Sequence, residues 1–121
     1  MTAWAPSGTL TAIVPTADLD RATSFYARLG FVVDGDHGHY RMLRNGDGGT
    51  LHLTRAVLPP GHAAHNQFGL YLYAADVAAR ATAFAGETFE PHGAEAKLWG
   101  MTEFSLLDPD GVLVRVGWPT D

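Results

Sequence analysis

The chain repeats itself, and this repeat constrains its fold more than any other feature of the sequence. The segment Ala17-Asp18-Leu19, followed by Arg-Ala-Thr-Ser-Phe, returns as Ala75-Asp76-Val77, followed by Arg-Ala-Thr-Ala-Phe. Asp-Gly precedes an alternating aliphatic strand in both halves, at 47–48 and 110–111. With 121 residues in total, neither half has enough core to stand alone. We therefore predict one domain, residues 1–121, built from two modules of about 1–60 and about 66–121.

The sequence of the first module predicts one helix and four strands. Its elements come in the order strand, helix and three short strands, over 8–14, 18–29, 31–33, 39–44 and 50–55. Asp18 or Thr16 can cap the start of the helix, and Gly30 suits its end. Glycine-rich turns over 34–38 and 45–49 separate the short strands.

The second module repeats this order after an irregular linker at 57–66, which contains two prolines. Its elements are a strand, a helix, a short strand and a hairpin, over 67–74, 75–85, 88–90 and 99–116. In the hairpin, Pro109 and Gly111 supply the backbone angles of a tight turn. Two βαβββ modules predict an α+β fold.

Strand alternation divides the side chains between two faces of the sheet. One face is apolar and is predicted to cover the helices: Leu10, Leu51, Leu53, Phe68, Leu70, Leu72, Val112, Val114 and Val116. The other is predicted to be polar and aromatic throughout: Thr9, Thr11, Thr50, His52, Thr54, Gln67, Tyr71, Tyr73 and Arg115. Superimposing the modules aligns Thr11 with Gly69, and His52 with Arg115. The polar face is either an ordinary solvated surface or a cleft for a small molecule, and its lack of Lys and Glu favours the cleft.

Composition excludes several functions. The absence of cysteine excludes disulfides, thiolate metal sites and cysteine nucleophiles. A net charge of −5 without a basic cluster argues against nucleic acid as a partner. No apolar run reaches the ~20 residues of a membrane helix, and no secretory signal is visible, so we expect a cytoplasmic protein without a membrane partner. Of the six histidines, only His52 points into the predicted cleft.

Four segments in order resemble the superfamily of glyoxalase, bleomycin-resistance proteins and extradiol dioxygenases, which share the vicinal oxygen chelate fold. They are 14–31, 51–55, 66–77 and 99–111. The resemblance implies that fold, and the superfamily contains both metalloenzymes and metal-free binding proteins. Its enzymes hold a divalent metal at positions matching Thr11, His52, Gly69 and Arg115, of which only His52 could serve. We therefore expect neither a metal nor another cofactor.

Within the superfamily, the chain resembles most the branch that sequesters antibiotics of the bleomycin type without catalysis. Trp99 matches the tryptophan before that branch's Gly-Arg-Glu-Phe segment, although the chain has one extra residue there, Met101 or Thr102. Asp34 matches an acidic residue and Tyr40 an aromatic one. In that branch an aromatic residue lies beside the acidic one, but this chain has Gly35 at that position. The role of stacking on the ligand could have moved to Tyr71 and Tyr73. In that branch, the ligand lies in a groove between two subunits of a swapped dimer.

These features predict a homodimer that holds a flat, positively charged natural product in an aromatic groove. The predicted ligand-binding residues are Trp99, Tyr40, Asp34, His52, Tyr71, Tyr73, Arg115, Thr11 and Met101. We treat Arg115 as a buried arginine that either pairs with a carboxylate such as Glu103 or contacts the ligand. Trp4 and Trp118 are predicted to pack on the partner subunit. The alternatives are a metal-dependent lyase or dioxygenase that uses His52, and an interaction module with a solvated sheet.

Overall fold

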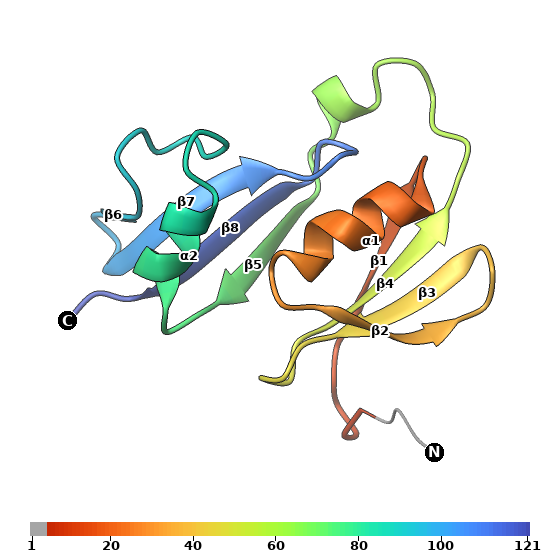
Figure 1. Ribbon diagram of the computed structural model, residues 1–121, viewed down its shortest axis with the longest axis horizontal. Helices are drawn as coiled ribbons and strands as arrows, with labels where there is room; N and C mark the ends of the chain where they lie inside the picture. The colour runs from red at the N-terminus through yellow and green to blue at the C-terminus, as the bar shows by residue number, and fades with distance from the viewer. Residues whose placement is uncertain (1–4) are drawn as a thin grey trace. The chain divides into compact units, whose positions relative to one another are not determined.

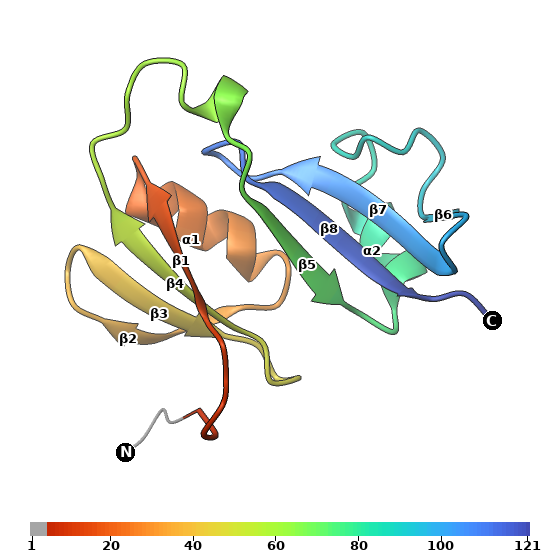
Figure 2. The same ribbon diagram turned by 180° about the vertical axis from the view of Figure 1, so that it is seen from behind.

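The computed structural model describes residues 5–121, so the prediction for Trp4 falls outside the described residues. The chain forms two compact units, one extending to His62 and the other running from Ala63 to Asp121. Each unit is a four-stranded mixed sheet with a helix on one face, while the opposite face carries no helix (Figure 1, Figure 2). The predicted α+β class and the two βαβββ modules of a vicinal oxygen chelate fold are confirmed.

The first unit follows the predicted order of elements. They are β1 (Ala12–Thr16), α1 (Leu19–Ala27), β2 (Val32–Asp36), β3 (Tyr40–Arg44) and β4 (Thr50–Arg55). The strands lie in the order β1-β4-β3-β2, with β1 parallel to β4 and the other neighbours antiparallel. The open face of this sheet carries every second residue of β4, starting with Thr50.

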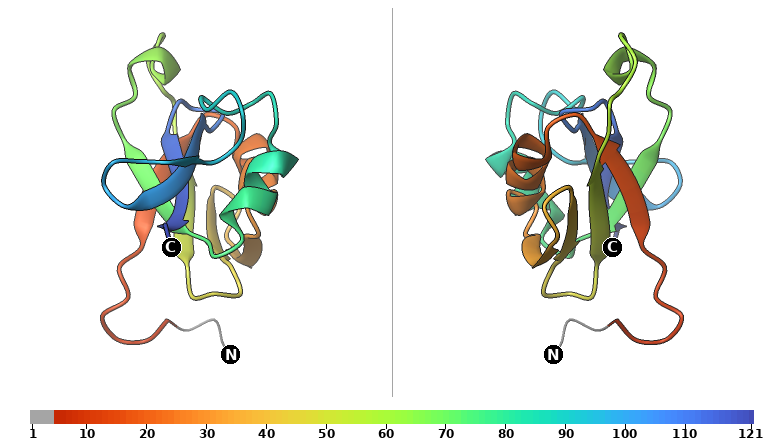
Figure 3. Two further views of the ribbon diagram at one scale, coloured as in Figure 1. Left: turned by 90° about the vertical axis from the view of Figure 1, so that its left-hand side faces the viewer. Right: turned by 90° about the vertical axis from the view of Figure 1, so that its right-hand side faces the viewer.

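The second unit repeats this arrangement (Figure 3). Its elements are a short 3-10 helix η1 (Ala63–His65), β5 (Gly69–Tyr73), α2 (Val77–Ala83), β6 (Glu95–Ala96), β7 (Met101–Leu107) and β8 (Leu113–Pro119). The strands lie in the order β5-β8-β7-β6, and β5 is parallel to β8. Within residues 5–121, no helix is long and apolar enough to cross a membrane.

The two helices begin differently, although both follow an Ala-Asp pair. The Asp18 carboxylate accepts a hydrogen bond from the Arg21 N–H (3.0 Å), so Asp18 is the cap, while the Thr16 hydroxyl accepts a hydrogen bond from the Asp18 N–H (3.3 Å). Asp76 makes no capping bond and instead accepts from Arg80 Nε over 2.8 Å. The second copy of the repeat has one more residue between aspartate and arginine, which places the two side chains four positions apart on the helix.

Each core lies between its sheet and its helix. The buried apolar side chains of the first unit are Val14, Leu19, Ala22, Tyr26, Leu29, Leu43, Leu51 and Leu53. Those of the second are Ala74, Val77, Ala81, Phe84, Phe104, Leu106, Val112, Val114 and Val116. The predicted helix-covering face is therefore correct for β4 and β8. It is wrong for Leu10, which is 94% exposed, and for Phe68, which is also exposed, because both residues precede their strands.

Several predicted elements differ from those in the structure. The first strand begins at Ala12 rather than at residue 8 and continues through Pro15, which a sheet edge tolerates because no ladder bond is lost there. The predicted turn at 34–38 is partly strand, since β2 continues to Asp36 with a register shift between Val33 and Gly35. No strand forms at 88–90, where only the Phe89 N–H bonds to a neighbouring carbonyl.

The predicted hairpin at the end of the chain is confirmed. The Asp108 carboxylate accepts hydrogen bonds from the N–H groups of Asp110 (2.8 Å) and Val112 (2.9 Å), and Gly111 has a φ of +84°. A β-carbon on Gly111 would overlap the backbone of Ala63. The end of the predicted linker therefore packs directly on the turn.

Candidate functional site

The open face of the second unit carries a cavity of about 480 Å³. Its walls are Tyr71, Tyr73, Trp99, Met101, Glu103 and Arg115. The strands explain this grouping, because β5 runs parallel to β8 with Tyr71 beside Arg115, and β7 places Glu103 opposite Gly117. Five of the nine predicted ligand-binding residues thus lie around one cavity.

The carboxylate of Glu103 holds this cavity together. Its Oε2 accepts hydrogen bonds from the Tyr71 hydroxyl (2.7 Å) and from Trp99 Nε1 (3.0 Å). Its Oε1 lies 3.7 Å from an Arg115 Nη1 atom and accepts no hydrogen bond within residues 5–121. One buried acceptor therefore fixes two aromatic walls and faces the arginine.

The predicted pairing of Arg115 with Glu103 is confirmed, but the prediction of a buried arginine is wrong. The Arg115 side chain is 45% exposed, whereas that of Glu103 is 3% exposed. The long arginine side chain reaches toward solvent from β8, while the shorter glutamate stays beneath the aromatic rings. The buried member of the pair is the carboxylate.

Burial and hydrogen bonding set the ionisation of these groups. Burial opposes the charge of Glu103, but the hydrogen bonds from Trp99 and Tyr71 and the charge of Arg115 outweigh it and lower the pKa of the carboxyl. Burial and the hydrogen bond to Glu103 raise the pKa of Tyr71 well above its ordinary value. At neutral pH, Glu103 is therefore an anionic acceptor and Tyr71 a neutral donor.

Gly117 is a site residue that the sequence reasoning missed. A β-carbon at this position would overlap the Tyr71 hydroxyl and would lie 2.9 Å from Glu103 Cγ. Tyr71 reaches the carboxylate only because β8 offers a residue without a side chain. Gly117 lies two positions after Arg115, hence on the same face of the alternating strand, and this spacing could have identified it.

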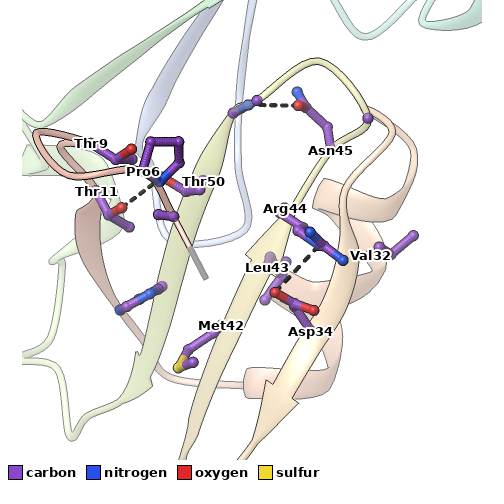
Figure 4. A pocket seen from close by; sticks show the side chains of 15 residues that line it. Pro6, Thr9, Thr11, Val32, Asp34, Met42, Leu43, Arg44, Asn45 and Thr50 are labelled. Atoms are coloured by element: carbon purple, nitrogen blue, oxygen red, sulfur yellow. Dashed lines mark hydrogen bonds and ion pairs between the residues drawn. The ribbon is translucent and has the colours of Figure 1, made fainter. Parts of the chain in front are cut away.

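The first unit has its own cavity of about 590 Å³ on its open face (Figure 4). Thr11, Asp34 and His52 are among the residues that line it. Figure 4 shows the ion pair between Asp34 and Arg44, whose Nε lies 3.3 Å from a carboxylate oxygen. Three further predicted ligand-binding residues therefore line this cavity. The carboxylate of Asp34 is already paired with Arg44.

Tyr40 approaches this cavity only through His52. Its hydroxyl lies 2.7 Å from His52 Nδ1, and the two rings meet edge to face. His52 therefore has a tyrosine as a hydrogen-bonding neighbour. Tyr40 itself is not among the residues that line the cavity.

The open face of the first unit is less polar than predicted. Ile13 pairs with His52 across β1 and β4 and is exposed, and Met42 lines the cavity beside it. Met42 and Arg44 lie two residues apart on β3, and the alternation of that strand identifies both. The prediction of a polar and aromatic face throughout is wrong at Ile13 and Met42.

The side chains at the four family metal positions do not fit a divalent metal ion. Thr11 exchanges a hydrogen bond with Thr50 (2.6 Å), Gly69 has no side chain, and Arg115 is a cation. His52 is the one potential ligand, and its Nδ1 is engaged by Tyr40. In the described part of the chain, no three His, Asp or Glu side chains lie close enough together to hold a metal.

Comparisons with known proteins agree with this fold. The family model described as the Glyoxalase/Bleomycin resistance protein/Dioxygenase superfamily matches residues 9–116. A search of curated proteins found no match.

Three solved structures illustrate the similarity. A bleomycin-binding protein complexed with bleomycin shares 26% identity, covers 93% of this chain and 98% of its own, and superimposes with a TM-score of 0.72. A bleomycin resistance determinant encoded on the transposon Tn5 shares 28% identity over the same fractions, with a TM-score of 0.74. A protein of unknown function from Agrobacterium tumefaciens shares 26% identity, covers 96% and 97% of the two chains, and has a TM-score of 0.70.

Proposed function

Because the chain belongs to the glyoxalase/bleomycin resistance protein/dioxygenase superfamily, we propose that it sequesters a flat natural product, such as an antibiotic of the bleomycin type, without converting it. The observation that carries this proposal is the aromatic cavity of the second unit. The proposed ligand contacts are Trp99, Tyr71, Tyr73, Met101 and Arg115 in that unit, and Thr11, Asp34, His52 and, through His52, Tyr40 in the first.

The physics of stacking supports a planar ligand. Trp99 is 62% exposed and Tyr73 is exposed as well, so a flat ring can cover them. Stacking contributes about 0.5–1.5 kcal/mol beyond the area it buries. Since Glu103 already fixes Trp99 and Tyr71, little side-chain entropy is lost when a ligand binds.

Ligand binding without catalysis has more support than an enzymatic function. The alternative, a metal-dependent lyase or dioxygenase, would depend on His52 with Thr11, Gly69 and Arg115 at the remaining positions. Those three positions offer no good metal ligand. A ligand-binding protein needs only the cavity.

The structure gives more support to a flat ligand than to a positively charged one. Asp34, the acidic residue among the predicted ligand contacts, is paired with Arg44. We therefore propose the flat ring system as the recognised feature.

We also propose that two copies associate and that the ligand lies in a groove at their interface. Exposed apolar side chains such as Ile13, Val32, Leu107 and Trp118 are candidates for burial in such a dimer. Sedimentation analysis tests this directly, because a monomer without ligand binding would favour the interaction module instead. The cytoplasmic location stays a prediction.

Calorimetric titration of chelator-treated protein tests the sequestering function. The panel contains bleomycin-type compounds and other flat cytotoxic natural products. We expect stoichiometric binding of at least one compound, recovery of that compound unchanged, and about tenfold weaker binding by Trp99→Ala. Leu98→Ala is the matched control, because Leu98 is fully exposed and does not line the cavity. Turnover that the chelator abolishes would instead support the enzyme.

A further inference from the structure

Both cavities direct the arginine of an ion pair outward and keep the carboxylate inside. In the second unit, Arg115 is the exposed partner of buried Glu103. In the first, the Arg44 side chain is 54% exposed and that of Asp34 only 20%. The charge that a ligand meets first is positive in each unit, although the chain as a whole has a net charge of −5.

The guanidinium of Arg115 also has unused donors. Its one ion pair, with Glu103, is 3.7 Å long, which exceeds the range of a good hydrogen bond. Because 45% of the side chain is exposed and Arg115 lines the cavity, the other N–H groups of the guanidinium are accessible to a ligand. Its N–H groups lie in a planar fork that matches the two oxygens of a carboxylate.

The carboxylate beneath it is not available to a ligand. Glu103 Oε2 already accepts two hydrogen bonds, and Oε1 is buried away from solvent. The aromatic residues Tyr71, Tyr73 and Trp99 line the same cavity as Arg115.

We propose that the cavity of the second unit recognises a planar aromatic compound that carries a carboxylate or a similar anion. The ring stacks on Trp99 and Tyr73, and the anion accepts hydrogen bonds from Arg115. This assignment rests on the proposed function, since it specifies the ligand class of the same site. The assignment concerns this cavity alone, where Coulomb repulsion from the exposed guanidinium disfavours a cation beside Arg115.

Three matched probes test the charge and the ring separately: 2-naphthoate, neutral 2-naphthalenemethanol and the 2-naphthylmethylammonium ion. Affinities are measured by calorimetry at neutral pH and low salt. We expect the carboxylate to bind about tenfold or more tightly than the ammonium ion, with the neutral alcohol between them. Arg115→Gln is expected to abolish this preference, and Arg115→Lys to retain part of it.

Arg21→Gln is the control for long-range charge. It removes one positive charge from an exposed helix position outside both cavities. It should leave the preference unchanged, and circular dichroism verifies that each variant is folded.

The outcomes distinguish this inference from the function on which it rests. Binding of the neutral alcohol together with equal or tighter binding of the ammonium ion overturns the anion assignment and leaves sequestration of flat ligands standing. A preference for the carboxylate that survives in folded Arg115→Gln also overturns it. If none of the three probes binds, the anion assignment is overturned, whereas the proposed function fails only if the panel of flat natural products does not bind either.

Discussion

The Tyr71 ring lies across Gly117, and its hydroxyl occupies the space that a β-carbon on residue 117 would fill. From there, the hydroxyl donates to Glu103 over 2.7 Å. Glu103 also accepts the Trp99 indole N–H, so the positions of two cavity walls depend on a glycine in a neighbouring strand. The cavity is therefore built as much by the residue that lacks a side chain as by those that line it.

Replacing Gly117 by alanine is expected to displace Tyr71 and break its hydrogen bond to Glu103. Overpacking of this kind lowers the free energy of unfolding by about 1–3 kcal/mol. Urea unfolding measures the loss, and titration with a flat ligand measures the accompanying loss of affinity. Gly69→Ala is the control, because its β-carbon would lie 3.6 Å from the Leu113 carbonyl, an ordinary contact. If Gly117→Ala were as stable as the wild type, Tyr71 could move away from residue 117 without loss of stability, which would contradict this prediction.

The lowered pKa of Glu103 predicts a loss of stability in acid. A carboxyl whose pKa is lower in the folded state stabilises the fold above its unfolded pKa, near 4.5, and this contribution disappears as the pH falls through the folded value. Unfolding of the wild type should therefore become easier below about pH 4.5. Glu103→Gln should remove this part of the pH dependence and destabilise the protein by about 1–3 kcal/mol at neutral pH, since the hydrogen bonds from Tyr71 and Trp99 lose their charged acceptor. Parallel pH profiles of the two proteins would contradict the assignment.

The sequence predicts the topology, and the face of the sheet on which each side chain lies, better than it predicts how deeply a side chain is buried. The repeat and the alternation predicted both modules, and the single charged residue in an aliphatic strand pointed to the pair between Arg115 and Glu103. Alternation cannot say which partner is buried, because that depends on side-chain length and on the rings above. It could not locate the start of β1 either, since Leu10 fits the pattern but no helix covers it. Burial is a property of the assembled layers rather than of the strand.

The raised pKa of Tyr71 predicts that the protein loses stability at alkaline pH. Its pKa is raised in the folded state, so its contribution to stability is complete below the ordinary tyrosine value near 10 and declines as the pH rises from there toward the folded value. Tyr71→Phe should flatten this decline and weaken the anchoring of Glu103. Tyr73→Phe is the matched control, because Tyr73 is exposed and its ring lies beside that of Tyr71. Ultraviolet titration of the phenol groups tests the prediction, and loss of the late-titrating group from the Tyr73 variant instead would refute it.

Divalent metal ions are expected to leave the stability of the protein unchanged. Thr11, Gly69 and Arg115 cannot replace the His and Glu ligands of the family's enzymes, and the Nδ1 atom of His52 bonds to Tyr40. An ion that binds only the native state raises the unfolding midpoint, so thermal unfolding with Zn²⁺, Mn²⁺ or Ni²⁺ in excess measures binding directly. We expect equal midpoints with metal and with chelator, in the wild type and in His52→Ala. A midpoint that metal raises in the wild type but not in His52→Ala would restore the case for a metalloenzyme.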